Sequence, residues 1–251
     1  MARWIPDDAE TEAALLREIG IQDAEELFAD VPRRVRLGRM GVGAGREEID
    51  VVRTVDKILA RNRPYSGFAN FLGGRIAPRF VPAAVDAILL RSEFYTSYTP
   101  YQPEVAQGIL QAVFEFQTMV ARLAGLPVAN ASLYDGANAL VEAVNLGVAA
   151  SGRQRVWLSS GAPPHWRAVL KTFAAGTGHV LVDVPLEHGL TVWPDAAAAS
   201  DAGEPPGVLV VGYPNYLGCL EDIGAARRIC DATGALLVVV ADPVSAAILR
   251  S

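Results

Sequence analysis

Hydroxyl and amide side chains gather in one short segment, YTPYQPEVAQG, which runs from Tyr98 to Gly108. Pro100 and Pro103 fix its backbone, so its polar groups are ordered at low entropic cost. We expect a helix to follow, with Glu104 in its first turn, where an acid is favourable. The segment is either a loop packed against the sheet or a preorganised polar lip that enters an active site, including one of another subunit. The lip side chains are those of Tyr98, Thr99, Tyr101, Gln102 and Glu104.

A second polar group, NASLYDGAN, stands immediately before the helical pattern ALVEAVNLGVAASG. Asp135 suits the N-cap of that helix, because its carboxylate can accept hydrogen bonds from the first-turn N–H groups. The same helix end could instead hold a phosphate, with Gly136 and Asn138 beside it. A carboxylate already in that place would repel a phosphate, so the residue types favour capping.

A third candidate, Asp242, closes the apolar run ALLVVVAD. In a pyridoxal-phosphate enzyme an acid at this strand end pairs with the pyridinium nitrogen. The alternative is a loop aspartate that caps the turn before Pro243. Pyridoxal phosphate also needs a lysine for its Schiff base, and the chain has only Lys57 and Lys171, each within an amphipathic helical pattern. We therefore expect no cofactor bound covalently to this chain.

Composition excludes several classes of function. The chain has 251 residues, a net charge of -6 and 51% hydrophobic residues, which disfavours nucleic-acid and anionic-membrane binding. No apolar run approaches the roughly 18 residues of a membrane span. The acidic N-terminus does not resemble a signal peptide, so we expect a cytoplasmic protein. Cys219 and Cys230 have no nearby ligands that would complete a metal site.

The later part of the chain predicts a parallel sheet. Four continuous apolar runs alternate with helical stretches, as strands covered on both faces require. The runs are RVWLSS (155–160), HVLVDV (179–184), GVLVVG (207–212) and ALLVVVAD (235–242). Ligands would then lie at the carboxyl ends of these strands. Residues 1–62 read as a helical N-terminal segment, and residues 63–251 read as an incomplete α/β domain, because no sequence remains for the flanking strands.

The segment from Ser97 to Ala137 resembles the signature region of the glycine decarboxylase P-protein of the glycine cleavage system, in its N-terminal half or alpha-type subunit. FLGG (71–74), RAVLKTF (167–173), YPNYLGCLED (213–222) and ADPVS (241–245) follow in the order typical of that family. The resemblance covers nearly the whole chain. It implies the large domain of a fold-type I pyridoxal-phosphate transferase, with its C-terminal part missing.

The resemblance also implies a function. The cofactor lysine would lie in a beta-type partner subunit, and two subunits of each type would decarboxylate glycine and pass its aminomethyl group to a lipoylated carrier (H) protein. On this basis the lip lines the route to the partner's cofactor, and Asp135, Gly136, Asn138 and Asp242 mark a vestigial cofactor site. Four positions depart from the family pattern, namely Arg79, Pro163, Gly212 and Asn138. An inactive, truncated or divergent paralogue that binds a related subunit is the alternative.

Overall fold

The computed structural model describes residues 8–38, 41–64, 69, 78–95, 99–194 and 205–249. The chain divides into two compact units, Met1–Phe68 and Ala69–Ser251. Tyr98 and the FLGG segment lie outside the described residues, so the predictions made for them stay predictions. No helix among the described residues is both long and apolar enough to cross a membrane.

The first unit is built from short helices, as predicted for the N-terminal segment. Its elements are α1 (Ala9–Ile19), the 3-10 helices η1 (Ala24–Phe28) and η2 (Arg33–Val35), and α2 (Glu48–Leu59). Asp8 accepts from the backbone N–H of Thr11, and Gly20 ends α1 at φ +85°. Asp23 and Glu26 form a capping box at η1. Short-range hydrogen bonds therefore define the ends of these elements.

The second unit begins with three helices, α3 (Ala83–Leu89), α4 (Ser92–Tyr95) and α5 (Gln107–Ala124). The prediction that Glu104 lies in the first turn of this helix is wrong, since α5 starts at Gln107. The N–H groups of Val105 and Ala106 donate to the carbonyls of Gln102 and Pro103, which makes a turn ahead of the helix. Glu104 therefore lies in this turn, and the first turn of α5 contains no acid.

A four-stranded parallel sheet follows, which confirms the predicted α/β class. Its strands are β1 (Arg155–Ser159), β2 (Val180–Val184), β5 (Val208–Tyr213) and β6 (Leu236–Ala241), in the order β2-β1-β5-β6. The crossovers carry α7 (Pro164–Thr177) and α9 (Ile223–Thr233), and α6 (Gly136–Ser151) precedes β1. The strands β3 (Leu186–Glu187) and β4 (Leu190–Thr191) form a small antiparallel hairpin, and α10 (Pro243–Ala246) follows β6.

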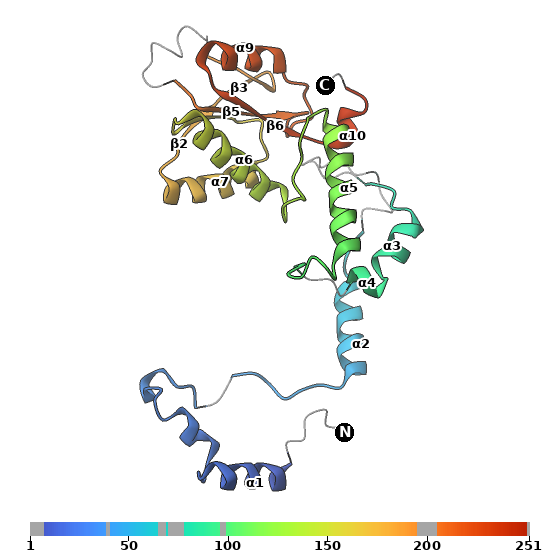
Figure 1. Cartoon of the computed structure of the whole chain (residues 1–251), viewed down its shortest axis with the longest axis vertical. Coiled ribbons are helices and arrows are strands. Elements are labelled where there is room, and N and C mark those ends of the chain that lie inside the picture. The colour runs from blue at the N-terminus through green and yellow to red at the C-terminus, as the bar shows by residue number, and fades with distance from the viewer. Residues whose placement is uncertain are drawn as a thin grey trace. The chain divides into compact units, whose positions relative to one another are not determined.

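The sheet is covered on both faces, with α6 and α7 on one side and α9 on the other (Figure 1). Alternate residues of β1 separate accordingly. Val156 and Leu158 pack with the first pair of helices, whereas Trp157 packs with Ile229 of α9. This alternation explains the apolar residues along β1 and β5, since both faces of each central strand are buried. Functional side chains are left to the strand ends.

Candidate functional site

Three polar side chains mark the carboxyl edge of the sheet, and one of them, Asp242, is a residue that the sequence singles out. Ser159 ends β1, Tyr213 ends β5, and Asp242 directly follows β6. From β1 the chain crosses to β2 on one side, and β5 and β6 lie on the other. The sheet therefore has its topological switch point between β1 and β5, where open α/β sheets place their ligands.

The lip lies beside the start of α5 rather than on the strands. The backbone N–H of Tyr101 donates to the carbonyl of Thr99 at 2.8 Å, which fixes the segment between the two prolines. Tyr101 is 78% exposed. Thr99, Tyr101 and Gln102 line a hollow of about 560 Å³ together with residues of α4 and α5. The other residues that line the hollow are Glu93, Phe94, Pro100, Val105, Ala106, Gly108 and Ile109.

Asp135 caps α6, as the sequence predicts. One carboxylate oxygen accepts from the backbone N–H of Asn138 at 2.9 Å, and the other accepts from its side-chain amide at 2.7 Å. The backbone hydrogen bond from Asn138 holds the pKa of Asp135 below its usual value. A phosphate at this helix end would meet a carboxylate that already accepts from the backbone N–H of Asn138.

Gly136 is required by close packing at the same helix end. A Cβ atom at this position would lie 2.2 Å from the indole ring of Trp166 on α7. Of the predicted vestigial group, Asp135, Gly136 and Asn138 are brought together at the start of α6. Neither these residues nor Asp242 is among those that line the hollow beside the lip.

Each carboxylate oxygen of Asp242 has a partner in the described part of the chain. It caps α10 by accepting from the backbone N–H of Val244 at 2.9 Å. Its other oxygen lies 2.6 Å from a guanidinium nitrogen of Arg79. Arg79, one of the four positions that depart from the family pattern, thus neutralises the predicted ring-binding acid. Of the two readings that the sequence left open, capping is the one this geometry provides.

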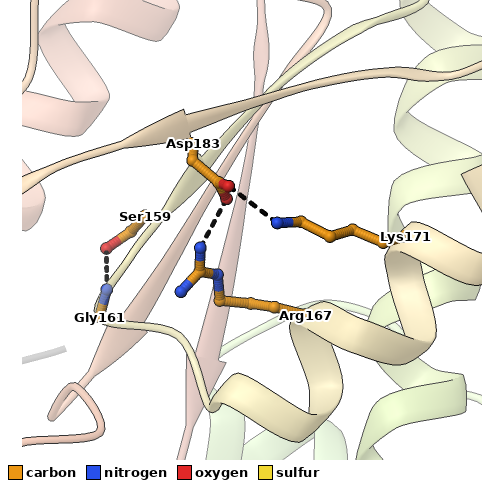
Figure 2. Close-up of polar contacts among 5 residues, drawn as sticks. All are labelled: Ser159, Gly161, Arg167, Lys171 and Asp183. Atoms are coloured by element: carbon orange, nitrogen blue, oxygen red, sulfur yellow. Dashed lines mark hydrogen bonds and ion pairs between the residues drawn. The ribbon is translucent and has the colours of Figure 1, made fainter.

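The two lysines do not suit a Schiff base. Lys171 projects from α7 to Asp183 of β2, with 2.9 Å between the ammonium and the carboxylate (Figure 2). Lys57 lies in the last turn of α2. With Lys171 held by Asp183, Asp135 acting as a cap and Asp242 paired with Arg79, the described residues of the second unit do not fit pyridoxal phosphate.

Asp183 is held between two cations of α7. Its register opposite Leu158 directs it to the face covered by α7, where Arg167 binds its second oxygen at 2.7 Å (Figure 2). Burial raises the pKa of Asp183, but the hydrogen bonds and charges of Lys171 and Arg167 outweigh this, so its pKa lies below the usual value. The cluster fastens the edge strand to its covering helix.

Two of the remaining departures have local explanations. Pro163 is fully buried at the start of α7. Gly212 allows a close approach, because a Cβ there would lie 3.1 Å from the Cα of Asn215. Both positions therefore contribute to packing at the carboxyl edge.

The sequence reasoning missed a buried polar group at the switch point. Ser159, Asn215 and Glu221 are 0%, 2% and 5% exposed and belong to one hydrogen-bonded network with Thr191. A polar residue within YPNYLGCLED was the available signal, but burial of Glu221 depends on the hairpin that folds over it. Within the described ranges no group of three His, Cys, Asp or Glu residues is arranged to hold a metal ion.

Comparison with known proteins covers almost the entire chain. A family model described as glycine cleavage system P-protein matches residues 2–251. A relative from Brevibacillus brevis, named probable glycine dehydrogenase (decarboxylating) subunit 1, is 40% identical over 99% of this chain. A relative of the same name from Exiguobacterium sibiricum is 41% identical over 99% of this chain. The chain spans 55% of the length of each of these relatives.

Solved structures give the same result at the level of the fold. A crystal structure of glycine decarboxylase (P-protein) of the glycine cleavage system, in inhibitor-bound form, is similar with a TM-score of 0.83 and 42% identity. It is matched over 99% of this chain and 55% of its own. A sphingosine-1-phosphate lyase from Burkholderia pseudomallei is similar with a TM-score of 0.51 at 15% identity, over 84% of this chain and 50% of its own. This second likeness supports the transferase-like fold alone.

Proposed function

Because the chain belongs to the glycine cleavage system P-protein family, we propose that it forms part of the alpha-type subunit of glycine dehydrogenase (decarboxylating). The subunit acts with a beta-type partner that carries pyridoxal phosphate. Together they decarboxylate glycine and pass its aminomethyl group to the lipoylated carrier protein in the cytoplasm. The observation that carries this proposal is the family match over residues 2–251.

The chemistry of this chain supports assigning the cofactor to the partner. The strand-end acid is paired with Arg79, the helix start is capped by Asp135, and Lys171 is held by Asp183. If another subunit supplies the cofactor, these residues of this chain do not need to bind it, and the cofactor still provides the electron sink for decarboxylation. The α/β unit, residues 63–251 in our domain proposal, then acts as a scaffold that completes the partner's site.

The lip is the part of this chain that we assign to that site. Its backbone is ordered by Pro100, Pro103 and the Tyr101–Thr99 hydrogen bond, and Thr99, Tyr101 and Gln102 line a hollow. Side chains that are already ordered before a substrate arrives lose little further conformational entropy when it binds. We assign Tyr101 and Gln102, with Tyr98 and Thr99, to the polar wall near glycine, and Glu104 to the turn that supports them.

The test is glycine-dependent exchange of labelled bicarbonate into the glycine carboxyl group. The assay contains the beta-type subunit and lipoylated carrier protein from the same genome, with and without this chain. Exchange that requires the chain supports the proposal. If exchange is the same without the chain, or absent with it while the full-length relative is active, the chain does not supply the alpha-type function.

A further inference from the structure

A carboxylate is buried at the switch point with only neutral donors around it. Oε2 of Glu221 accepts from the backbone N–H of Thr191 at 2.9 Å, and Oε1 accepts from the Thr191 hydroxyl and the Asn215 amide, each at 2.8 Å. These are its hydrogen-bond donors within the described ranges. Burying a charge costs free energy unless the charged oxygens accept hydrogen bonds in place of those from water. The network can therefore tolerate little movement of the groups that donate to it.

The hydroxyl groups of the network donate in a single direction, from Ser159 to Thr191 and from Thr191 to Glu221. The hydroxyl of Thr191 gives its single proton to Glu221, so it must accept from the hydroxyl of Ser159, which lies 2.6 Å away. The hydroxyl of Ser159 in turn accepts from the backbone N–H of Gly161 at 2.9 Å (Figure 2). The end of β1 is thereby connected to Glu221 through the β3–β4 hairpin.

Asn215 extends the network into the loop after β5. Its side-chain carbonyl accepts from the backbone N–H groups of Leu217 and Cys219, both at 3.0 Å. Its amide group donates to Glu221 and, at 2.7 Å, to the carbonyl of Gly189 in the hairpin. One side chain thus closes the loop on itself and fastens it to the hairpin.

Packing leaves no room for a ligand among these groups. A Cβ at Gly161 would lie 3.0 Å from Oε1 of Glu221 and 3.1 Å from Cβ of Asn215. At Gly161 the chain is therefore closely packed, at the switch point between β1 and β5 where open α/β sheets offer a crevice. Above it the loop presents Leu217 and Leu220, which are 60% and 52% exposed.

We propose that Glu221 is a positioning residue, which fixes the 213–220 loop to the 186–191 hairpin. In the assembled enzyme, this chain then contributes a rigid loop and hairpin at the carboxyl edge of its sheet. Glu221 does not touch substrate or cofactor. The proposal rests on the proposed function for its effect on turnover, whereas the fixing of the loop is a property of this chain alone.

The first experiment compares amide hydrogen exchange in the whole chain and in the Glu221→Gln variant. The glutamine has the same shape, but its NH₂ group would face the N–H or O–H donors that Glu221 accepts from. We expect exchange at Thr191, Leu217 and Cys219 to be at least about tenfold faster in the variant. Glu187→Gln is the matched control, because Glu187 lies in the same hairpin with its side chain 72% exposed. Unchanged exchange at all three amides in Glu221→Gln would overturn the proposal.

A second pair of variants covers the case in which Glu221→Gln does not fold. Thr191→Ser keeps the hydroxyl, whereas Thr191→Val removes it and leaves the backbone donor. We expect protection like that of the parent chain in the serine variant and faster exchange around Asn215 in the valine variant. Equal protection in the two variants would also contradict the network.

The effect on turnover is measured by labelled bicarbonate exchange with the partner subunit, well below the melting temperature of each variant. We expect a roughly tenfold lower rate at saturating glycine for Glu221→Gln and no change for Glu187→Gln. An unchanged rate with a lowered melting temperature would make Glu221 merely structural and overturn its positioning role. If the parent chain itself supports no exchange of labelled bicarbonate, the proposed function is wrong. The expected effect of Glu221→Gln on turnover is then wrong as well. Amide exchange still decides whether Glu221 holds the loop.

Discussion

A guanidinium nitrogen of Arg79 lies 2.6 Å from the carboxylate of Asp242, joining the segment before α3 to the end of β6. The two residues are 163 positions apart in the sequence. Asp242 also caps α10. The pair places a positive charge of this chain against the acid that, by its position, would otherwise suit a cofactor ring.

Removing this ion pair should not create a cofactor site. For Arg79→Ala we expect a loss of about 0–1 kcal/mol in the free energy of unfolding, because the pair is partly exposed. We also expect no retention of pyridoxal phosphate, since Lys171 of the same unit is held by Asp183. Urea unfolding and absorbance spectra after gel filtration check these outcomes, with Arg79→Lys as the charge-conserving control. Stoichiometric cofactor binding by the alanine variant would refute our assignment of the cofactor to the partner.

Gly136→Ala tests the packing at the start of α6. Its new methyl group would overlap the ring of Trp166, and overpacking of this kind costs about 1–3 kcal/mol. Gly176→Ala is the matched control, because a Cβ there meets no atom within 4 Å and α7 should gain about 0.5–1 kcal/mol. Both values come from urea unfolding. Similar stability changes of the same sign for the two variants would show that the Trp166 contact is not limiting.

Asp183→Asn tests the cluster between β2 and α7 through its pH dependence. The folded-state pKa of Asp183 is lowered, so its stabilisation is present above the unfolded pKa of about 3.9 and is lost as pH falls through the folded value. At pH 7 we expect the variant to lose about 1 kcal/mol, from two partly exposed ion pairs. Towards pH 3 the difference between the two proteins should shrink.

The matching variant Lys171→Met removes one of these two pairs and should show about half of the effect. Denaturant unfolding across the pH series measures both variants. A stability difference for Asp183→Asn that does not change with pH would exclude charge pairing as its origin.

The two cysteines should differ in reactivity. Burial raises the pKa of Cys230 to about 11, so almost no reactive thiolate exists at pH 8. Cys219 is only half-buried. We expect one fast equivalent with a thiol-specific disulfide reagent in the native chain, its loss in Cys219→Ser, and two equivalents after denaturation. Native labelling of Cys230 at a rate like that of Cys219 would be inconsistent with this burial.

Changes to the lip should reduce activity without preventing assembly. Tyr101→Phe together with Gln102→Ala removes two hydrogen-bonding groups, each worth about 0.5–1.5 kcal/mol, so we expect bicarbonate exchange to fall about tenfold or more. Tyr95→Phe is the control, since Tyr95 is exposed on α4 but does not line the hollow. Gel filtration with the partner subunit checks assembly. Full activity of the double variant would contradict our assignment of the lip to the active site.

Local patterns were sufficient for most of the fold and for part of the candidate site. The four apolar runs became the four parallel strands, and Asp135 could be assigned as a cap because its partner, Asn138, is three residues away. The start of α5 was misjudged, since Pro103 sits in a turn that delays the helix to Gln107. Proline is compatible with both a helix start and a turn, so its presence alone does not distinguish them.

By itself, the sequence determined the α/β class and the Asp135 cap of α6, because each depends on composition or on residues a few positions apart. Only the tertiary structure decided that Asp242 pairs with Arg79 and that Glu221 is buried beneath Thr191 and Asn215. The partners of these carboxylates come from separate strand ends and loops. Their ionic and hydrogen-bonded roles exist only once the parallel sheet has brought those ends to one edge.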